Sequence, residues 1–183
     1  MKLEVLQRGY TYHIYNRGIN STPIFVSDEN KNYFLQLLSK YVAPHCSVFA
    51  YCLMDNHFHL LIRVDDPAEK VTQSFSNFFN AYAKAFNKAT NRTGSLFEKH
   101  FKRIAIHNEE YLKQLIVYIH LNPKHHYNID FERYKYTSYK ACLSSKPTIL
   151  KRDEVLNYFG DRDNFIFVHQ QRNLDLHEKF LLE

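Results

Sequence analysis

Two apolar runs separated by a three-residue turn constrain the fold of this chain more than any other feature. The runs Cys46–Leu53 (CSVFAYCL) and His57–Val64 (HFHLLIRV) both have the length and composition of strands. The residues between them, Met54-Asp55-Asn56, have turn chemistry. Strands joined this closely pair side by side and antiparallel. The sequence therefore predicts a β-hairpin at the centre of an antiparallel sheet.

Other elements are predicted on both sides of the hairpin. Residues 10–16 indicate an edge or first strand, and residues 96–106 contain another strand. Three helices are expected, each with a start signal. The first, capped by Ser27 or Asp28, spans 29–41, and its apolar stripe is Tyr33, Leu37, Leu38 and Tyr41. The second spans 69–89, and its apolar stripe is Phe75, Phe78, Phe79, Tyr82 and Phe86. The third is capped by Asn108 and ends near Leu121 because Pro123 follows. The order β-α-β-β-α-β-α predicts an α+β fold, a ferredoxin-like antiparallel sheet with helices packed on one face.

The length and composition indicate one globular domain. We expect residues 1–145 to form it and residues 146–183 to be a helical extension, packed on the domain or trailing from it. No apolar run reaches the roughly 18 residues that cross a bilayer, and the start of the chain does not resemble a signal peptide. We therefore expect a cytoplasmic protein without a membrane partner. The three cysteines form no CxxC pair and are expected to be reduced, buried thiols.

Basic charge is concentrated in one segment. Residues 84–103 carry six basic side chains against Glu98 alone, a net charge of +5 that equals that of the whole chain. Phe86, Phe97 and Phe101 are interleaved with them. Positive charge beside aromatic rings suits single-stranded nucleic acid, whereas a solvated helix face with core aromatics is the alternative. The candidate DNA-binding residues are Lys84, Lys88, Arg92, Lys99, Lys102 and Arg103.

Two short motifs could carry chemistry. His57 and His59 lie two apart on a strand, so they share a face and can bind one divalent cation; two unrelated surface histidines are the alternative. Tyr118 and Asn122 lie four apart on the third predicted helix, so they also share a face. By themselves, they are more simply explained as a core tyrosine and an ordinary helix stop before Pro123.

These motifs together resemble a known family. The segment Met54–Ile62 (MDNHFHLLI) resembles the HUH signature, and Tyr118–Pro123 (YIHLNP) resembles the tyrosine-bearing helix of single-tyrosine HUH transposases. Tyr12–Gly18 is similar to the opening strand of the IS200-like branch that includes the REP-associated tyrosine transposases, and Ser74–Arg103 is similar to its central helix and the strand that follows. The resemblance covers about residues 8–145.

The resemblance implies a role for each motif residue. His57 and His59 match the metal-ligating histidines, Asn122 matches a third ligand, and Tyr118 matches the nucleophile. A divalent cation, Mg²⁺ or Mn²⁺, would hold and polarise the scissile phosphate. Attack by Tyr118 would give a 5′-phosphotyrosine and a free 3′-hydroxyl. His120 is a poor candidate for the base because it points to another side of the helix.

The expected activity is therefore that of a DNA transposase, a site-specific endonuclease for hairpin-containing single-stranded DNA. Two alternatives remain open at this point: a non-catalytic nucleic-acid-binding module, and a metal-dependent phosphodiesterase that uses water. The expected partner is single-stranded DNA with hairpin or palindromic repeats, bound by a monomer or a homodimer of a bacterial, nucleoid-associated protein.

Overall fold

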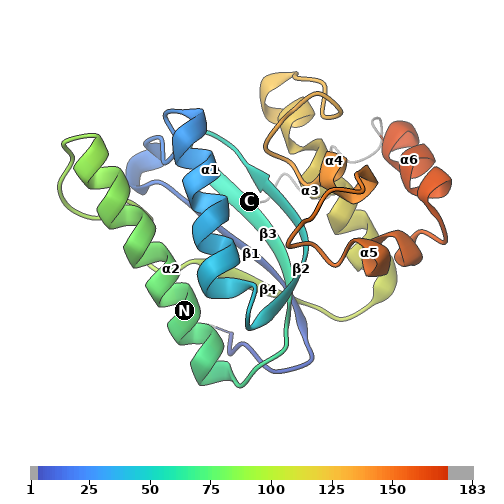
Figure 1. Cartoon of the computed structure of the whole chain (residues 1–183), viewed down its shortest axis with the longest axis horizontal. Coiled ribbons are helices and arrows are strands. Elements are labelled where there is room, and N and C mark those ends of the chain that lie inside the picture. The colour runs from blue at the N-terminus through green and yellow to red at the C-terminus, as the bar shows by residue number, and fades with distance from the viewer. Residues whose placement is uncertain (1–3, 173–183) are drawn as a thin grey trace.

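The computed structural model describes residues 4–172 and contains one four-stranded sheet. Its strands are β1 (Thr11–Arg17), β2 (Cys46–Leu53), β3 (His57–Val64) and β4 (Lys102–Ile106). They lie in the order β2-β3-β1-β4, and every neighbouring pair is antiparallel (Figure 1). The predicted hairpin is confirmed with the predicted bounds. β1 is the first strand in the chain but lies inside the sheet, because β4 pairs with its outer side.

The helices follow the predicted order and the α+β ferredoxin-like fold class is confirmed, but the predicted packing of helices on one face holds only for the first two long helices. The helices of the βαββαβ unit, α1 and α2, cover one face of the sheet, and α3 comes after that unit and lies on the other face (Figure 1). The helical segments are η1 (Ile19–Ser21), α1 (Asp28–Leu37), the π-helical η2 (Leu38–Val42), α2 (Ala68–Ala89), α3 (Glu109–Tyr127), α4 (Tyr139–Leu143), α5 (Arg152–Tyr158) and α6 (Arg162–Gln171). Ser27 and Asn108 cap α1 and α3 through their side chains, as predicted.

An aromatic cluster fills the space between α1, α2 and the sheet. Phe34 of α1 is fully buried, with its ring centroid 5.0 Å from that of Phe58 on β3 and 4.7 Å from that of Phe78 on α2. The predicted stripe of the first helix is wrong at Tyr33, which is exposed. Phe34 begins the buried stripe because it precedes Leu37 by three residues and Leu38 by four, so that these three side chains share one helix face.

The other face of the sheet is covered by α3. Every residue from Leu115 to Pro123 is buried, which is expected of a helix enclosed on all sides. The predicted end at Pro123 is wrong, because α3 continues to Tyr127 and ends at Asn128 in a left-handed conformation. An internal proline costs about 3 kcal/mol through its missing N–H and its steric clash. The burial of apolar side chains along α3 offsets that cost, so the helix gains another turn.

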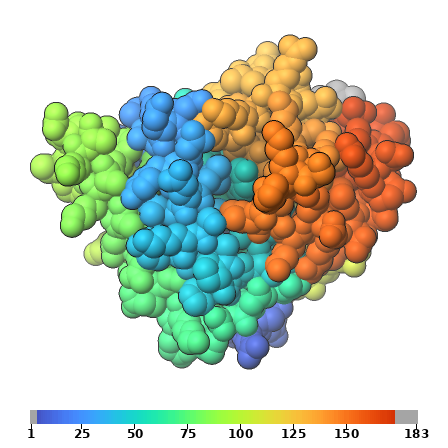
Figure 2. Space-filling view, in the orientation of Figure 1, coloured from blue at the N-terminus to red at the C-terminus, as the bar shows by residue number. Residues whose placement is uncertain are grey.

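The described part of the predicted C-terminal extension packs on the same side as α3. The backbone N–H of Lys151 donates to the carbonyl of Val48 on β2, and Glu154 of α5 forms an ion pair with Arg63 of β3. On α6, Phe165 is fully buried. Figure 2 shows the orange and red C-terminal segments forming a continuous surface with the rest of the molecule. Residues 173–183, the end of that extension, lie outside the described residues.

Two expectations from composition can be compared with the structure. All three cysteines, Cys46, Cys52 and Cys142, are buried and unpaired, as expected of reduced thiols. Among the helices of residues 4–172, none has both the length and the apolar composition needed to cross a membrane.

The aromatic cluster gives a stability prediction. Phe34→Ala should lower the free energy of unfolding by about 3–5 kcal/mol, because it removes a fully buried ring and leaves a cavity. The matched control is Tyr33→Ala on the exposed side of the same turn, which should cost less than about 1 kcal/mol. Urea denaturation of both variants measures the difference. Equal costs would contradict the buried stripe described above.

Candidate active site

His57 and His59 lie at the start of β3 and project toward α3. Phe58, between them, contacts the aromatic cluster on the opposite face. The ring centroids of the two histidines lie 5.2 Å apart, with the rings nearly perpendicular. His59 is buried and His57 is half-buried. This placement excludes the alternative of two unrelated histidines on a solvated strand, and it confirms that the two imidazoles share a face.

α3 brings Tyr118 and Asn122 to the same place. The ring centroid of Tyr118 lies 5.8 Å from that of His59, with the two rings close to perpendicular. One turn later, the amide Nδ2 of Asn122 donates to the carbonyl oxygen of Tyr118 at 3.0 Å. The amide interacts with the imidazole of His57 on its other side. The predicted set of His57, His59, Tyr118 and Asn122 is therefore brought together in space.

Burial keeps the imidazoles of this site uncharged at neutral pH. Loss of solvation lowers the pKa of His57 to about 4, with a smaller lowering from His126 and a small opposing effect of the Asn122 side chain. The pKa of His59 is lowered well below its ordinary value by burial and by neighbouring histidines. Neutral imidazoles have a lone pair to offer a cation, whereas imidazolium ions do not.

The donor set fits a divalent cation. The Oδ1 atom of Asn122 is buried and has no hydrogen-bond partner of good geometry among the described residues. An unsatisfied buried carbonyl oxygen is costly, and a cation would satisfy it. Within residues 4–172, no three side chains of the His, Cys, Asp or Glu type converge as a metal site, so the amide is needed to complete the set. Two nitrogens and one amide oxygen suit Mn²⁺ or Mg²⁺, with positions left for phosphate and water oxygens.

Three residues near this set were missed by sequence reasoning. His13 of β1 contacts His59, and Arg17 of the same strand pairs with His57 in the register of the sheet. Both lie in β1, where side chains two residues apart share a face. The alternation that puts His13, Tyr15 and Arg17 on one face was the signal in the sequence that could have identified them. His126 lies one turn beyond Asn122, with its ring centroid 5.1 Å from that of His57. It was missed because the helix was predicted to end at Pro123.

His120 belongs to a different cluster, so the prediction that it is not the base is consistent with its position. Its Nδ1 contacts His169 Nε2 at 2.9 Å and its Nε2 contacts Ser138 Oγ at 2.7 Å. All three residues are fully buried between α3 and the C-terminal helices. Both ring nitrogens of His120 already have a partner within the core, whereas Oδ1 of Asn122 has none, so this network stabilises the core.

The predicted basic segment is divided between the two faces of the sheet. Lys102 pairs with Tyr15, whose ring stacks on His59, so Lys102 lies on the histidine face about 10 Å from His59 across two strand spacings. Lys99 is exposed just before β4. Arg103 pairs with Ile14 and lies on the other face, where its guanidinium stacks over Phe101. Adjacent strand residues point to opposite faces, so Lys102 and Arg103 cannot contact the same ligand surface.

The remaining basic residues of the segment lie on or beside α2. Lys84 and Lys88 are exposed on this helix, which packs on the face away from His57 and His59. Arg92 hydrogen-bonds to Asn87 and to the carbonyl of Ser95, and so closes the loop after α2. A role of these three residues in DNA binding stays a prediction.

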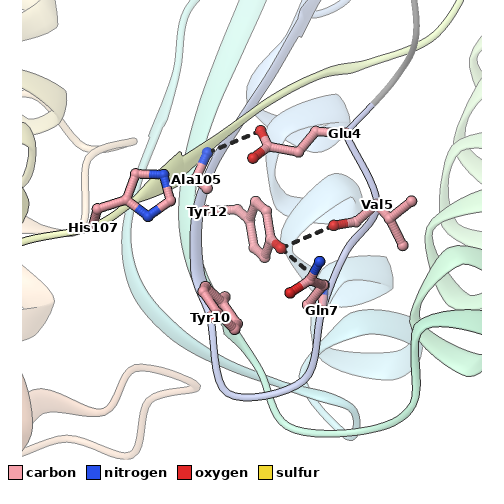
Figure 3. Close-up of a pocket in the computed structure, with 7 residues that line it drawn as sticks. All are labelled: Glu4, Val5, Gln7, Tyr10, Tyr12, Ala105 and His107. Atoms are coloured by element: carbon pink, nitrogen blue, oxygen red, sulfur yellow. Dashed lines mark hydrogen bonds between the residues drawn. The ribbon is translucent and has the colours of Figure 1, made fainter.

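One pocket lies away from the histidine site. It has a volume of about 430 Å³ and is formed where the N-terminal segment covers the edge of β4 (Figure 3). Within it, the Tyr12 hydroxyl donates to the carbonyl of Val5, and Glu4 accepts from the backbone N–H of Ala105. Tyr12 and Ala105 are paired neighbours on the α2 side of the sheet. The pocket therefore does not open toward His57 and His59.

A family model of IS200-like transposases matches residues 7–122, which is more than half of the chain. The chain belongs to the IS200-like transposase family. The match includes both histidines of the pair, Tyr118 and Asn122. No curated protein sequence matches the chain.

A solved structure supports the same fold for this IS200-like transposase. It is that of a REP-associated tyrosine transposase bound to a REP hairpin, with a TM-score of 0.61 and 14% sequence identity. The likeness covers 80% of this chain and 88% of the other. At this level of identity the comparison shows a common fold, which extends beyond the residues that the family model matches.

The buried histidines predict how stability depends on pH. The folded-state pKa of His169 is about 4 because burial disfavours its charged form, whereas an unfolded histidine has a pKa near 6.5. Below about pH 6.5 the unfolded chain therefore binds more protons, and folding stability is lost as pH falls. Each such histidine contributes a slope of about 1.4 kcal/mol per pH unit between about pH 6.5 and 4.

Denaturation of the metal-free protein at a series of pH values measures this slope. His169→Gln keeps a polar side chain but cannot titrate. The slope of unfolding free energy against pH should therefore fall by about 1.4 kcal/mol per pH unit, the contribution of one bound proton. A slope that does not change in this variant would show that His169 is charged in the folded protein.

Proposed function

We propose that this IS200-like transposase cuts and rejoins single-stranded DNA at hairpin-containing sites through a covalent bond to Tyr118. The observation that carries the proposal is the packing of Tyr118 against His59 on the face where His57 and Asn122 also converge. Membership of a transposase family supports DNA as the substrate. The hairpin is suggested by the DNA bound in the structurally similar REP-associated transposase.

His57, His59 and Asn122 would hold a divalent cation, Mn²⁺ or Mg²⁺. When bound, that cation supplies positive charge to the scissile phosphate and so favours nucleophilic attack. The protein residues contribute neutral donors, and the double charge of the ion is therefore not reduced by carboxylates. The exposed side chains of Lys99 and Lys102 add positive charge on the route that a DNA backbone would follow across β1 and β4.

The tyrosine performs the covalent step. The phenolic oxygen of Tyr118 loses its proton and bonds to phosphorus, while the bond from phosphorus to the 3′ oxygen breaks. The 3′ oxygen takes up a proton and leaves as a hydroxyl, and the 5′ end of the DNA stays on the tyrosine as a phosphodiester. The reverse attack by a 3′-hydroxyl rejoins a strand and releases Tyr118. The bond energy is conserved in the phosphotyrosine, so no external energy source is required.

The polarity of the covalent adduct tests this proposal. Incubation of the full chain with Mn²⁺ and single-stranded hairpin oligonucleotides should attach the 3′-labelled fragment to the protein and release the 5′-labelled fragment. The adduct should survive SDS and map to the peptide that contains Tyr118. Tyr118→Phe keeps the ring and its packing, so it should abolish the adduct while DNA binding persists.

Control variants separate the alternatives. Tyr111→Phe, two turns earlier on α3, should retain the adduct, and His57→Ala should lose both the adduct and Mn²⁺ binding measured by calorimetry. Cleavage by Tyr118→Phe without an adduct would instead indicate a phosphodiesterase that uses water. DNA binding without cleavage by the wild-type chain would indicate a non-catalytic binding module.

The division of basic charge predicts which lysines face the DNA. The double variant Lys99→Ala/Lys102→Ala should bind single-stranded DNA more weakly and with a shallower dependence on salt. Each lost phosphate contact should reduce the log–log slope by about 0.7. Lys84→Ala/Lys88→Ala removes the same charge from α2 and should leave the slope unchanged. Fluorescence anisotropy titrations over a range of salt concentrations measure both slopes, and a larger loss in the α2 variant would place the DNA on the opposite face.

A further inference from the structure

A buried histidine that the proposed chemistry does not use lies directly behind one of the metal ligands. His13 Nε2 lies 2.9 Å from His59 Nδ1, across the pairing of β1 with β3. His13 is 1% exposed and His59 is 3% exposed, so water does not compete for this contact.

A hydrogen bond between two neutral imidazoles fixes the position of both protons. Each neutral ring has one N–H, so one ring donates and the other accepts. If His13 donated, the proton of His59 would be on Nε2, and this nitrogen could not bind a cation. If His59 donates through Nδ1, its Nε2 has the lone pair that a metal requires. The choice between these two tautomers decides whether His59 can be a ligand.

The second histidine of the site shows the same arrangement. His57 Nδ1 lies 2.7 Å from Oδ1 of Asn56, the residue immediately before β3. An amide oxygen only accepts, so His57 must donate through Nδ1, which leaves the lone pair on Nε2. The Nδ1 atom of each imidazole therefore has a hydrogen-bond partner, His13 for His59 and Asn56 for His57. The Nε2 atoms of both rings can then bind one cation.

We propose that His13 is a positioning residue of the metal site, which accepts a hydrogen bond from His59 Nδ1 and holds His59 in its metal-binding tautomer and orientation. The inference rests on the proposed metal-dependent function. It gives β1 a role beyond its place in the sheet, because His13 would orient the metal-binding histidine without touching the substrate. Partners of this kind behind a metal-bound histidine typically contribute a factor of about 10–100 to metal affinity.

The chain contains a matched control for the alternative that the pair only stabilises the core. His120 and His169 form another buried pair with the same 2.9 Å separation of ring nitrogens. The outer nitrogens of that pair contact Ser138 Oγ and the carbonyl of Phe165, so it is completed within the core. Disrupting it should affect stability and not metal affinity.

Calorimetric titration of the full chain with Mn²⁺ alone tests the inference. His13→Phe should weaken Mn²⁺ binding by about 10–100-fold, because the ring is retained but the acceptor is lost. His13→Gln should restore most of the affinity, since its amide oxygen can accept from Nδ1. His169→Phe should lower the melting temperature and leave Mn²⁺ affinity unchanged. Equal losses in His13→Phe and His13→Gln, or unchanged affinity in His13→Phe, would refute the positioning role.

A measurement on the wild-type protein tests the tautomer of His59 even if a variant does not fold. Nitrogen-15 NMR of the metal-free chain should show the proton of His59 on Nδ1, and a proton on Nε2 would overturn the inference. The outcomes also separate the inference from the proposed function. If the wild-type chain does not bind Mn²⁺, the metal-dependent function fails; if it binds Mn²⁺ equally well without His13, only the positioning role fails.

Discussion

The packing of α3 across the histidine face of the sheet is the interaction on which the candidate site depends. The β-strand supplies two imidazoles, but the tyrosine and the amide come from a helix about sixty residues later in the sequence. They meet because α3 is buried on one side by β2 and β3 and on the other by the C-terminal helices. A helix enclosed in this way has little freedom to rotate or shift, so Tyr118 stays beside His59.

The same enclosure explains why the donor side chains of the site are uncharged. Burial removes the charged forms of His13, His57 and His59, and within the described residues no carboxylate completes a cluster with them. A phosphodiester already carries negative charge, so carboxylate ligands would weaken its attraction to the ion. Imidazole and amide donors avoid this loss. The positive charge of Lys99 and Lys102 lies further out, where it can attract the DNA backbone without repelling the cation.

The two faces of the sheet differ in what they bury. Phenylalanines and Tyr82 fill the α1 and α2 side, whereas the opposite side combines the apolar side chains of α3 with the polar cluster of the site. Alternation along β3 connects them, because Phe58 belongs to the first group and its two histidine neighbours to the second. This separation allows the core to remain close-packed while an uncharged but polar cluster is placed on the other face.

The sequence by itself determined the features that depend on local periodicity and turn chemistry. The hairpin, the order of the elements, the caps at Ser27 and Asn108 and the shared faces of His57 with His59 and of Tyr118 with Asn122 all follow from spacing along the chain. Only the tertiary structure decided what depends on the environment of a residue. Because α3 is buried, the helix continues past Pro123, and its last turn places His126 beside His57. No local rule predicts this continuation, since proline ordinarily ends a helix. Likewise, the pairing of β1 with β3 placed His13 behind His59, and the pairing of β4 with β1 decided that Lys102 and not Arg103 lies on the histidine face, since both pairings join residues that are distant in the sequence.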